Sequence, residues 1–126
     1  MKVTEIDIHR VTLRYDEARA YELIHYHDLT QRTIYVARTD TGLVGLGEGE
    51  GVATQEMLDQ YIGSNPFDWI GDETSLGMGT AMYDLMGKAA GVPVYKLFGQ
   101  KYRSWIPVAA WTVSTHPERM ARAVQA

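Results

Sequence analysis

The stretch Gly79–Gly99, GTAMYDLMGKAAGVPVYKLFG, decides the fold predicted for this chain. Starting at Met78, just before this stretch, apolar residues recur at the i, i+3, i+4, i+7 spacing of one helical face: Met78, Ala81, Met82, Leu85, Met86 and Ala89. Gly91 favours the left-handed conformation that ends a helix, and Pro93 prevents the helix from continuing. The pattern therefore predicts a buried helix that starts near residues 72–75 and ends at Ala90.

Two charged residues of this helix lie one turn apart on its other side. Asp84 precedes Lys88 by four positions, and this order, acid before base, is the favourable one for an i, i+4 pair. On a well-patterned helix such a pair is usually a surface or interface ion pair rather than a catalytic acid and base. The short apolar run at residues 94–98 then predicts a turn that packs on a neighbouring element.

Three segments before the helix have the patterns of β-strands, at residues 3–13, 31–39 and 43–48. The sequence Asp40-Thr41-Gly42 between the second and third segments predicts a hairpin turn. We expect Val44 and Leu46 of the third strand to face inward. Thr54 is a suitable N-cap for a short helix that Gly63 would end. The predicted fold class is α+β, a three-stranded antiparallel meander followed by a helical segment.

The sequence after Gly99 changes character. Residues 106–113 form a compact apolar run, which is typical of a strand buried on both faces. Residues 115–118, Thr-His-Pro-Glu, form a capping box that predicts the start of a further helix. No stop signal follows before Ala126, so the pattern of this part predicts one β-strand and an unfinished helix.

Composition narrows the class of protein. The chain has 126 residues, a formal net charge of −4 and a pI of about 5.5. This acidic balance does not favour binding to nucleic acid or to an anionic membrane. It has no cysteine, which suits a cytoplasmic protein. The charged N-terminus has no apolar core of a signal peptide, and no apolar run reaches the ~20 residues of a membrane span.

One motif carries a family resemblance: Ala81, Asp84-Leu85, Gly87-Lys88-Ala89, Gly91-Val92-Pro93-Val94, Leu97 and Gly99. It resembles the last helix of the N-terminal capping domain in the enolase superfamily, in the branch of mandelate racemase and the muconate-lactonizing enzymes. Met82, Tyr83 and Phe98 depart from the pattern. The resemblance implies a capping domain at residues 1–100 and the truncated start of a (β/α) barrel, an incomplete TIM barrel, at residues 101–126.

The resemblance also implies a function for the complete enzyme. A Mg²⁺-dependent enzyme would abstract a proton α to the carboxylate of a small substrate such as an acid sugar, as a dehydratase, racemase or cycloisomerase. We expect this enzyme to be a homo-oligomer. In the family the bases and metal ligands lie on later barrel strands, so we assign no catalytic and no metal-binding residue to this chain. By itself the chain is expected to be inactive and to need no cofactor.

The residues assigned to substrate binding come from two capping loops that the resemblance implies. The first loop, Tyr15–Leu29, contains His25, Tyr26 and His27, and the second contains Glu48 and Glu50. The alternative is that all five are polar surface residues, since loops are rich in them. Two imidazoles and one acid are too few to predict a metal site in the first loop.

A second hypothesis keeps the fold and discards catalysis. The chain would then be a stand-alone α+β module that binds a small ligand or a partner. The last predicted helix, which has no stop signal, favours the enzyme fragment over this module.

Overall fold

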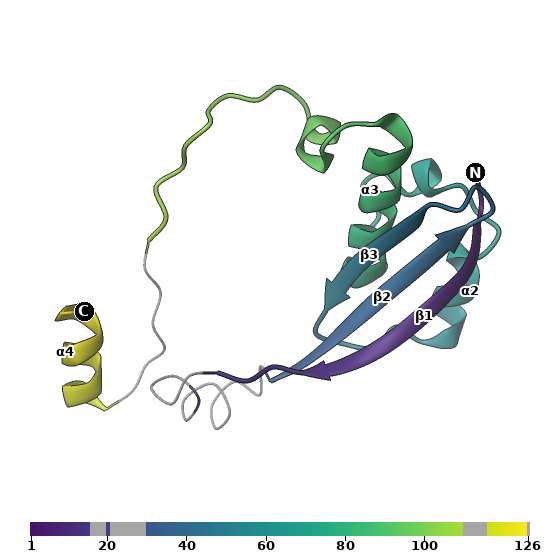
Figure 1. Ribbon diagram of the computed structural model, residues 1–126. Coiled ribbons are helices and arrows are strands. Elements are labelled where there is room, and N and C mark those ends of the chain that lie inside the picture. The colour runs from purple at the N-terminus through teal and green to yellow at the C-terminus, as the bar shows by residue number, and fades with distance from the viewer. Residues whose placement is uncertain (16–19, 21–29, 110–115, 126) are drawn as a thin grey trace. The chain divides into compact units, whose positions relative to one another are not determined.

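The computed structural model describes residues 1–15, 20, 30–109 and 116–125. Contacts divide the chain into two units, of which the first combines Met1–Val11 with Arg32–Tyr102. The second combines Thr12–Gln31 with Arg103–Ala126. The first unit holds nearly all of the described sheet and most of the helices (Figure 1).

The sheet consists of β1 (Val3–Thr12), β2 (Gln31–Thr39) and β3 (Val44–Gly49), in that spatial order. β2 and β3 are antiparallel, with Thr33 opposite Gly49 and Arg38 opposite Val44. At the ends of β1, the amide of Asp40 donates to the Lys2 carbonyl and that of Leu13 to the Thr30 carbonyl, so β1 is also antiparallel to β2. The predicted meander is confirmed (Figure 1).

Two α-helices and two short 3₁₀ helices complete the first unit: α2 (Gln55–Tyr61), η2 (Pro66–Trp69), α3 (Leu76–Ala90) and η3 (Val94–Phe98). The hydroxyl of Thr54 caps α2 by accepting from the Met57 amide, as predicted. The hydroxyl of Ser75 caps α3 in the same way, and Gly91 ends α3 with a φ of 66°. The predicted organising helix is therefore present between the expected limits.

The core lies between α3, α2 and one face of the sheet. It contains five residues of the predicted face of α3 together with residues of β1, β2 and α2: Met78, Ala81, Met82, Leu85, Met86, Val3, Tyr35, Ala37, Leu58 and Tyr61. Ala89 was expected on this face but is exposed, because it lies in the last turn of α3.

The inward face of β3 differs from the prediction. Leu46 is 52% exposed, and the residues that face α3 are Gly45 and Gly47. A Cβ atom on Gly45 would lie 2.5 Å from the Ala81 carbonyl oxygen, and one on Gly47 would overlap the Gly77 carbonyl oxygen. The prediction that Val44 and Leu46 face inward was wrong, because α3 approaches β3 so closely that only glycine fits between them.

Gly47→Ala tests this contact. We expect it to lower the free energy of unfolding by about 2 kcal/mol or more, since the added methyl must displace helix backbone rather than a flexible side chain. Gly51→Ala is the matched control, because a Cβ there meets no atom within 4 Å. Urea unfolding of both variants provides the measurement. Equal stability of the two variants would show that the contact is not so close.

Asp84 and Lys88 bind the backbone of β3. The Asp84 carboxylate accepts from the Leu46 amide at 2.8 Å, and the Lys88 ammonium donates to the Val44 carbonyl at 2.7 Å. The two side chains also pair with each other at 2.7 Å, as the i, i+4 spacing predicted. The pair therefore fastens α3 to the outer side of β3.

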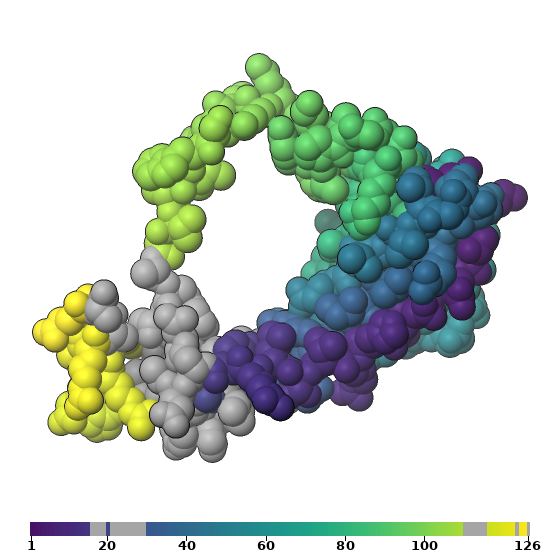
Figure 2. Space-filling model, in the orientation of Figure 1, coloured from purple at the N-terminus to yellow at the C-terminus, as the bar shows by residue number. Residues whose placement is uncertain are grey.

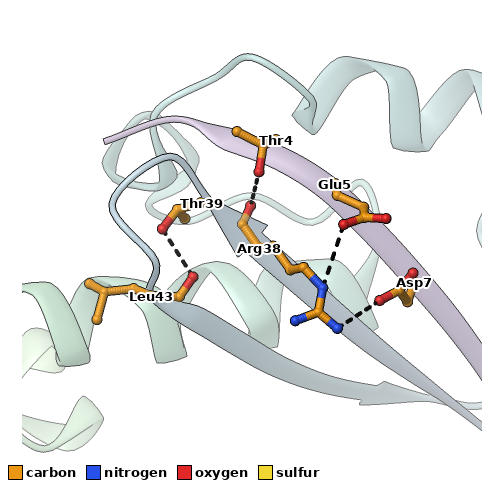
Figure 3. A network of polar contacts seen from close by, with 6 residues as sticks. All are labelled: Thr4, Glu5, Asp7, Arg38, Thr39 and Leu43. Atoms are coloured by element: carbon orange, nitrogen blue, oxygen red, sulfur yellow. Dashed lines mark hydrogen bonds and ion pairs between the residues drawn. The ribbon is translucent and has the colours of Figure 1, made fainter.

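The opposite face of the sheet, which lies toward the viewer in Figure 2, carries charged residues such as Arg38 as well as apolar ones such as Val36 and Leu46. There Arg38 of β2 forms ion pairs with Glu5 at 3.5 Å and Asp7 at 3.1 Å, both on β1 (Figure 3). Near the hairpin turn, the Thr4 hydroxyl donates to the Arg38 carbonyl, and the Thr39 hydroxyl donates to the Leu43 carbonyl (Figure 3). The contacts of Arg38 and Thr4 tie β1 to β2, and the Thr39 contact stabilises the turn between β2 and β3.

A buried tyrosine fixes the segment before α3. The Tyr61 hydroxyl donates to the Asp72 carboxylate at 2.5 Å, and the Tyr61 ring packs against Trp69. Burial raises the pKa of Asp72, but hydrogen bonds from Thr74 and Tyr61 outweigh it, so the pKa lies below its usual value. Burial and the same carboxylate raise the pKa of Tyr61.

This lowered pKa predicts an acid-sensitive contribution to stability. In the unfolded chain the Asp72 carboxyl titrates at about pH 3.9. The stabilisation by Asp72 is therefore complete above that pH. It is lost as the pH falls through the lower folded value. In urea unfolding between pH 7 and pH 2.5, Asp72→Asn should therefore be less stable than the parent near neutrality, and the difference should shrink in acid. The exposed neighbour Glu73, changed to Gln, should show no such shrinking difference.

The second unit contains α4 (Pro117–Gln125), which confirms the helix predicted from the capping box. The strand expected at residues 106–113 is absent from its described part, 106–109, where Ile106 and Val108 are exposed. An apolar strand needs paired neighbours, and residues 106–109 have none in the described structure. Among the described helices, none has the length and apolar character needed to cross a bilayer.

Candidate functional site

Both acids assigned to the second capping loop lie beside one arginine. Arg32 Nε is 3.0 Å from Glu48 Oε1, and Arg32 Nη1 is 3.2 Å from Glu50 Oε1. Arg32 comes from β2, Glu48 from β3, and Glu50 directly follows β3. The structure thus brings two of the five predicted site residues together and adds Arg32 to them.

The hairpin register explains this cluster. Ile34 pairs with Glu48 and Thr33 with Gly49, so one step further along β2 Arg32 faces Glu50. Alternation along β2 puts Arg32 on the sheet face opposite to buried Tyr35. Side chains that meet across an antiparallel pair of strands interact directly. The register therefore allows Arg32 to form ion pairs with Glu48 and Glu50.

Exposure and charge define what the cluster offers to a ligand. The side chain of Arg32 is only 19% exposed, whereas those of Glu48 and Glu50 are 53% and 74% exposed. Nη1 of Arg32 is buried, and no described acceptor meets the angle of a hydrogen bond to it, although Glu50 is within ion-pair distance. The cluster carries two negative charges and one positive charge.

The loop that follows Glu50 is held by a buried hydroxyl. Tyr35 Oη donates to the Gly51 carbonyl at 2.9 Å and accepts from the Ala53 amide at 2.7 Å. The Tyr35 side chain is almost fully buried. The loop between β3 and α2 is therefore attached to the core of the first unit at two backbone atoms.

A cavity of about 500 Å³ opens beside the cluster. It lies between the end of β3, the loop that follows it and the start of α3. Its lining combines the charged cluster with small and apolar residues: Arg32, Tyr35, Glu48, Gly49, Glu50, Gly51, Val52, Ala53, Met57, Ser75, Leu76 and Gly77. The cavity can hold the end of a small ligand.

Three predicted site residues and two missed ones complete this comparison. His25, Tyr26 and His27 lie outside the described residues. The sequence analysis did not identify Arg32 and Tyr35. A hairpin centred on Thr41 sums each opposing pair to about 82, and this arithmetic would have placed Arg32 opposite Glu50.

A larger cavity, of about 720 Å³, lies along α3 and η3 and is lined mainly by apolar side chains such as Leu76, Tyr83 and Phe98. Asp84 and Lys88, which also line it, are already bound to each other and to β3. We interpret this surface as a packing face and place the candidate site at the Arg32 cluster.

The chemistry available at the candidate site is binding. Exposed carboxylates of Glu48 and Glu50 can accept hydrogen bonds from hydroxyl or ammonium groups of a ligand. Within the described ranges, no three His, Asp or Glu side chains converge closely enough to hold a metal ion. The described residues therefore do not fit Mg²⁺.

Two curated proteins are similar in sequence. The N-succinyl-L-Arg/Lys racemase of Bacillus cereus is 29% identical over 147 aligned positions, which cover 96% of this chain and 40% of the racemase. The D-galactonate dehydratase of Pectobacterium atrosepticum is 30% identical over 113 positions, which cover 69% of this chain and 29% of the dehydratase. The chain thus spans less than half the length of either relative. No family model matches the chain.

Solved structures agree with these relatives. The crystal structure of the Bacillus cereus racemase matches 98% of this chain and 40% of its own length, with a TM-score of 0.68 and 27% identity. A dipeptide epimerase from Enterococcus faecalis, complexed with Mg and the dipeptide L-Leu-L-Tyr, matches 79% of this chain and 35% of its own length, with a TM-score of 0.52 and 26% identity. A Silicibacter pomeroyi protein, described as a candidate mandelate racemase/muconate lactonizing enzyme, matches 99% of this chain and 40% of its own length. It has a TM-score of 0.72 and 23% identity, which bears on the fold alone.

Proposed function

Because the homologues and structural neighbours of this chain are members of the mandelate racemase and muconate-lactonizing branch of the enolase superfamily, we propose that it is the capping part of a racemase, epimerase or dehydratase. The reaction would begin with removal of a proton α to a carboxylate. One observation carries the proposal: the match to an N-succinyl Arg/Lys racemase covers 98% of the chain, with a TM-score of 0.68 and 27% identity. Residues 1–100 would be the capping domain and residues 101–126 the start of the barrel.

In this proposal the Arg32 cluster contacts the part of the substrate that lies away from the reacting carbon. Glu48 and Glu50 would accept hydrogen bonds from the substrate, while Arg32 holds both carboxylates in place. The exposure of the two carboxylates and the adjoining cavity support this role. His25, Tyr26 and His27 would act from the first capping loop.

The proposed substrate is a small carboxylate. An acid sugar is one candidate, supported by the similarity to a galactonate dehydratase, and an N-acylated amino acid or a dipeptide is another, supported by the similarity to a racemase and an epimerase. In the proposed complete enzyme, residues of barrel strands beyond this chain would hold Mg²⁺, and the metal would supply stabilisation of negative charge. A cytoplasmic homo-oligomer is the proposed state of the complete enzyme.

A chimaeric enzyme tests the proposed function. Residues 1–126 would replace the matching segment of the Bacillus cereus racemase, and incorporation of deuterium at the α-carbon from D₂O would be measured. The panel would contain N-succinyl amino acids, dipeptides and acid sugars. We expect exchange with at least one class of substrate, and Glu48→Gln with Glu50→Gln should raise KM several-fold. The control is the racemase without its capping segment. A folded chimaera that exchanges no faster than this control would contradict the proposal.

The isolated 126-residue chain provides a second prediction. We expect it to show no turnover on the same panel and no saturable micromolar binding of Mg²⁺ in isothermal titration calorimetry. The reason is that the proposed bases and metal ligands lie in barrel strands beyond this chain. Tight, saturable Mg²⁺ binding would contradict this division of roles. Saturable binding of a small ligand without turnover would favour the stand-alone binding module.

A further inference from the structure

We propose that Tyr35 is a positioning residue that holds the loop after β3, and with it Glu50, in the geometry for ligand binding. Fixing the loop is a property of this chain alone. The consequence for substrate rests on the proposed function. Tyr35 itself is placed as a support for the loop, not as a group that touches the reacting atoms.

The first argument is that one hydroxyl acts as both a hydrogen-bond donor and an acceptor. Tyr35 Oη donates to Gly51 and accepts from Ala53, so one atom closes the turn between these two residues. The residues between the end of β3 at Gly49 and the start of α2 at Gln55 form no helix or strand. The Tyr35 hydroxyl therefore satisfies one backbone carbonyl and one backbone amide of this loop, which in a strand or helix would bond to other backbone groups.

The second argument is that close packing restricts the Tyr35 ring. Gly77 of α3 leaves room for the Tyr35 ring, because a Cβ at that position would overlap the ring. Gly49 borders the ring as well, with a Cβ there 3.9 Å from it. A ring held between two glycines and almost fully buried presents its hydroxyl at a fixed point.

The third argument connects this fixed point to the charged cluster. Glu50 lies outside β3 and directly precedes Gly51, whereas Glu48 lies within β3. Only Glu50 therefore depends on the loop for its position beside Arg32. Loss of the Tyr35 hydroxyl should loosen Glu50 and leave Glu48 in place.

Tyr35→Phe tests the proposal, with Tyr61→Phe as the matched control. Both substitutions remove a hydroxyl from a buried tyrosine, and the Tyr61 hydroxyl binds Asp72 instead of the loop. In the 126-residue chain, amide hydrogen exchange of Ala53 should become about tenfold faster in Tyr35→Phe, the order expected for one lost hydrogen bond. It should stay unchanged in Tyr61→Phe. Unchanged exchange of Ala53 in Tyr35→Phe would overturn the proposal.

The chimaeric enzyme supplies the functional readout. We expect Tyr35→Phe to raise KM several-fold with kcat within about twofold of the parent, since Tyr35 supports binding and not chemistry. A general loss of stability would instead lower the active fraction and leave KM unchanged, as Tyr61→Phe would report. Faster exchange at Ala53 with an unchanged KM would overturn the link to substrate. An inactive parent chimaera would count against the proposed function alone, because the exchange measurement does not depend on it.

Discussion

The close contact of β3 with α3 is the constraint on which the rest of this domain depends. Side chains on the inner face of β3 would hold the helix away from the sheet, and Gly45 and Gly47 remove them. Backbone then lies against backbone, and the buried residues of α3 reach past β3 to the middle of the sheet. This arrangement also brings Asp84 and Lys88 within hydrogen-bond distance of the β3 backbone.

The same close contact shapes the candidate site. Where α3 begins, Gly77 leaves a space that the Tyr35 ring fills, and the hydroxyl at the end of that ring holds the loop after β3. The cavity beside Glu48 and Glu50 therefore lies between β3 and α3, which approach each other closely at glycines. The glycine-rich end of β3 thus allows close packing at Gly45 and Gly47 and borders the cavity at Gly49 and Gly51.

Local signals in the sequence account for what could be predicted. The caps at Thr54 and Gly91 and the hairpin turn each depend on a few neighbouring residues, so the elements and their limits were predictable. The inward face of β3 was not, because hydrophobicity assigned it to Val44 and Leu46, whereas the distance between two backbones decides it. Glycines at alternate positions of a strand, such as Gly45 and Gly47, indicate a close backbone contact only when the helix that packs against the strand is known.

The candidate site was predictable in part for a similar reason. Glu48 and Glu50 were assigned by their place in a loop, and they do lie together. Their partner Arg32 is sixteen residues from Glu48, and its role follows from strand register instead of any local motif. The Tyr35 hydroxyl could not be found from sequence, since a buried tyrosine on a strand is most simply explained as core.

The ion pair on the outer side of β3 has a consequence for how molecules of this chain can associate. In the described sheet β3 is an edge strand, and Asp84 and Lys88 occupy two of its outward backbone groups. A strand from another molecule could add there only by breaking that pair. Extension of one sheet from molecule to molecule needs an open edge strand on both sides of every molecule. By occupying two backbone groups of β3, the charged pair therefore opposes the addition of a further strand at this edge.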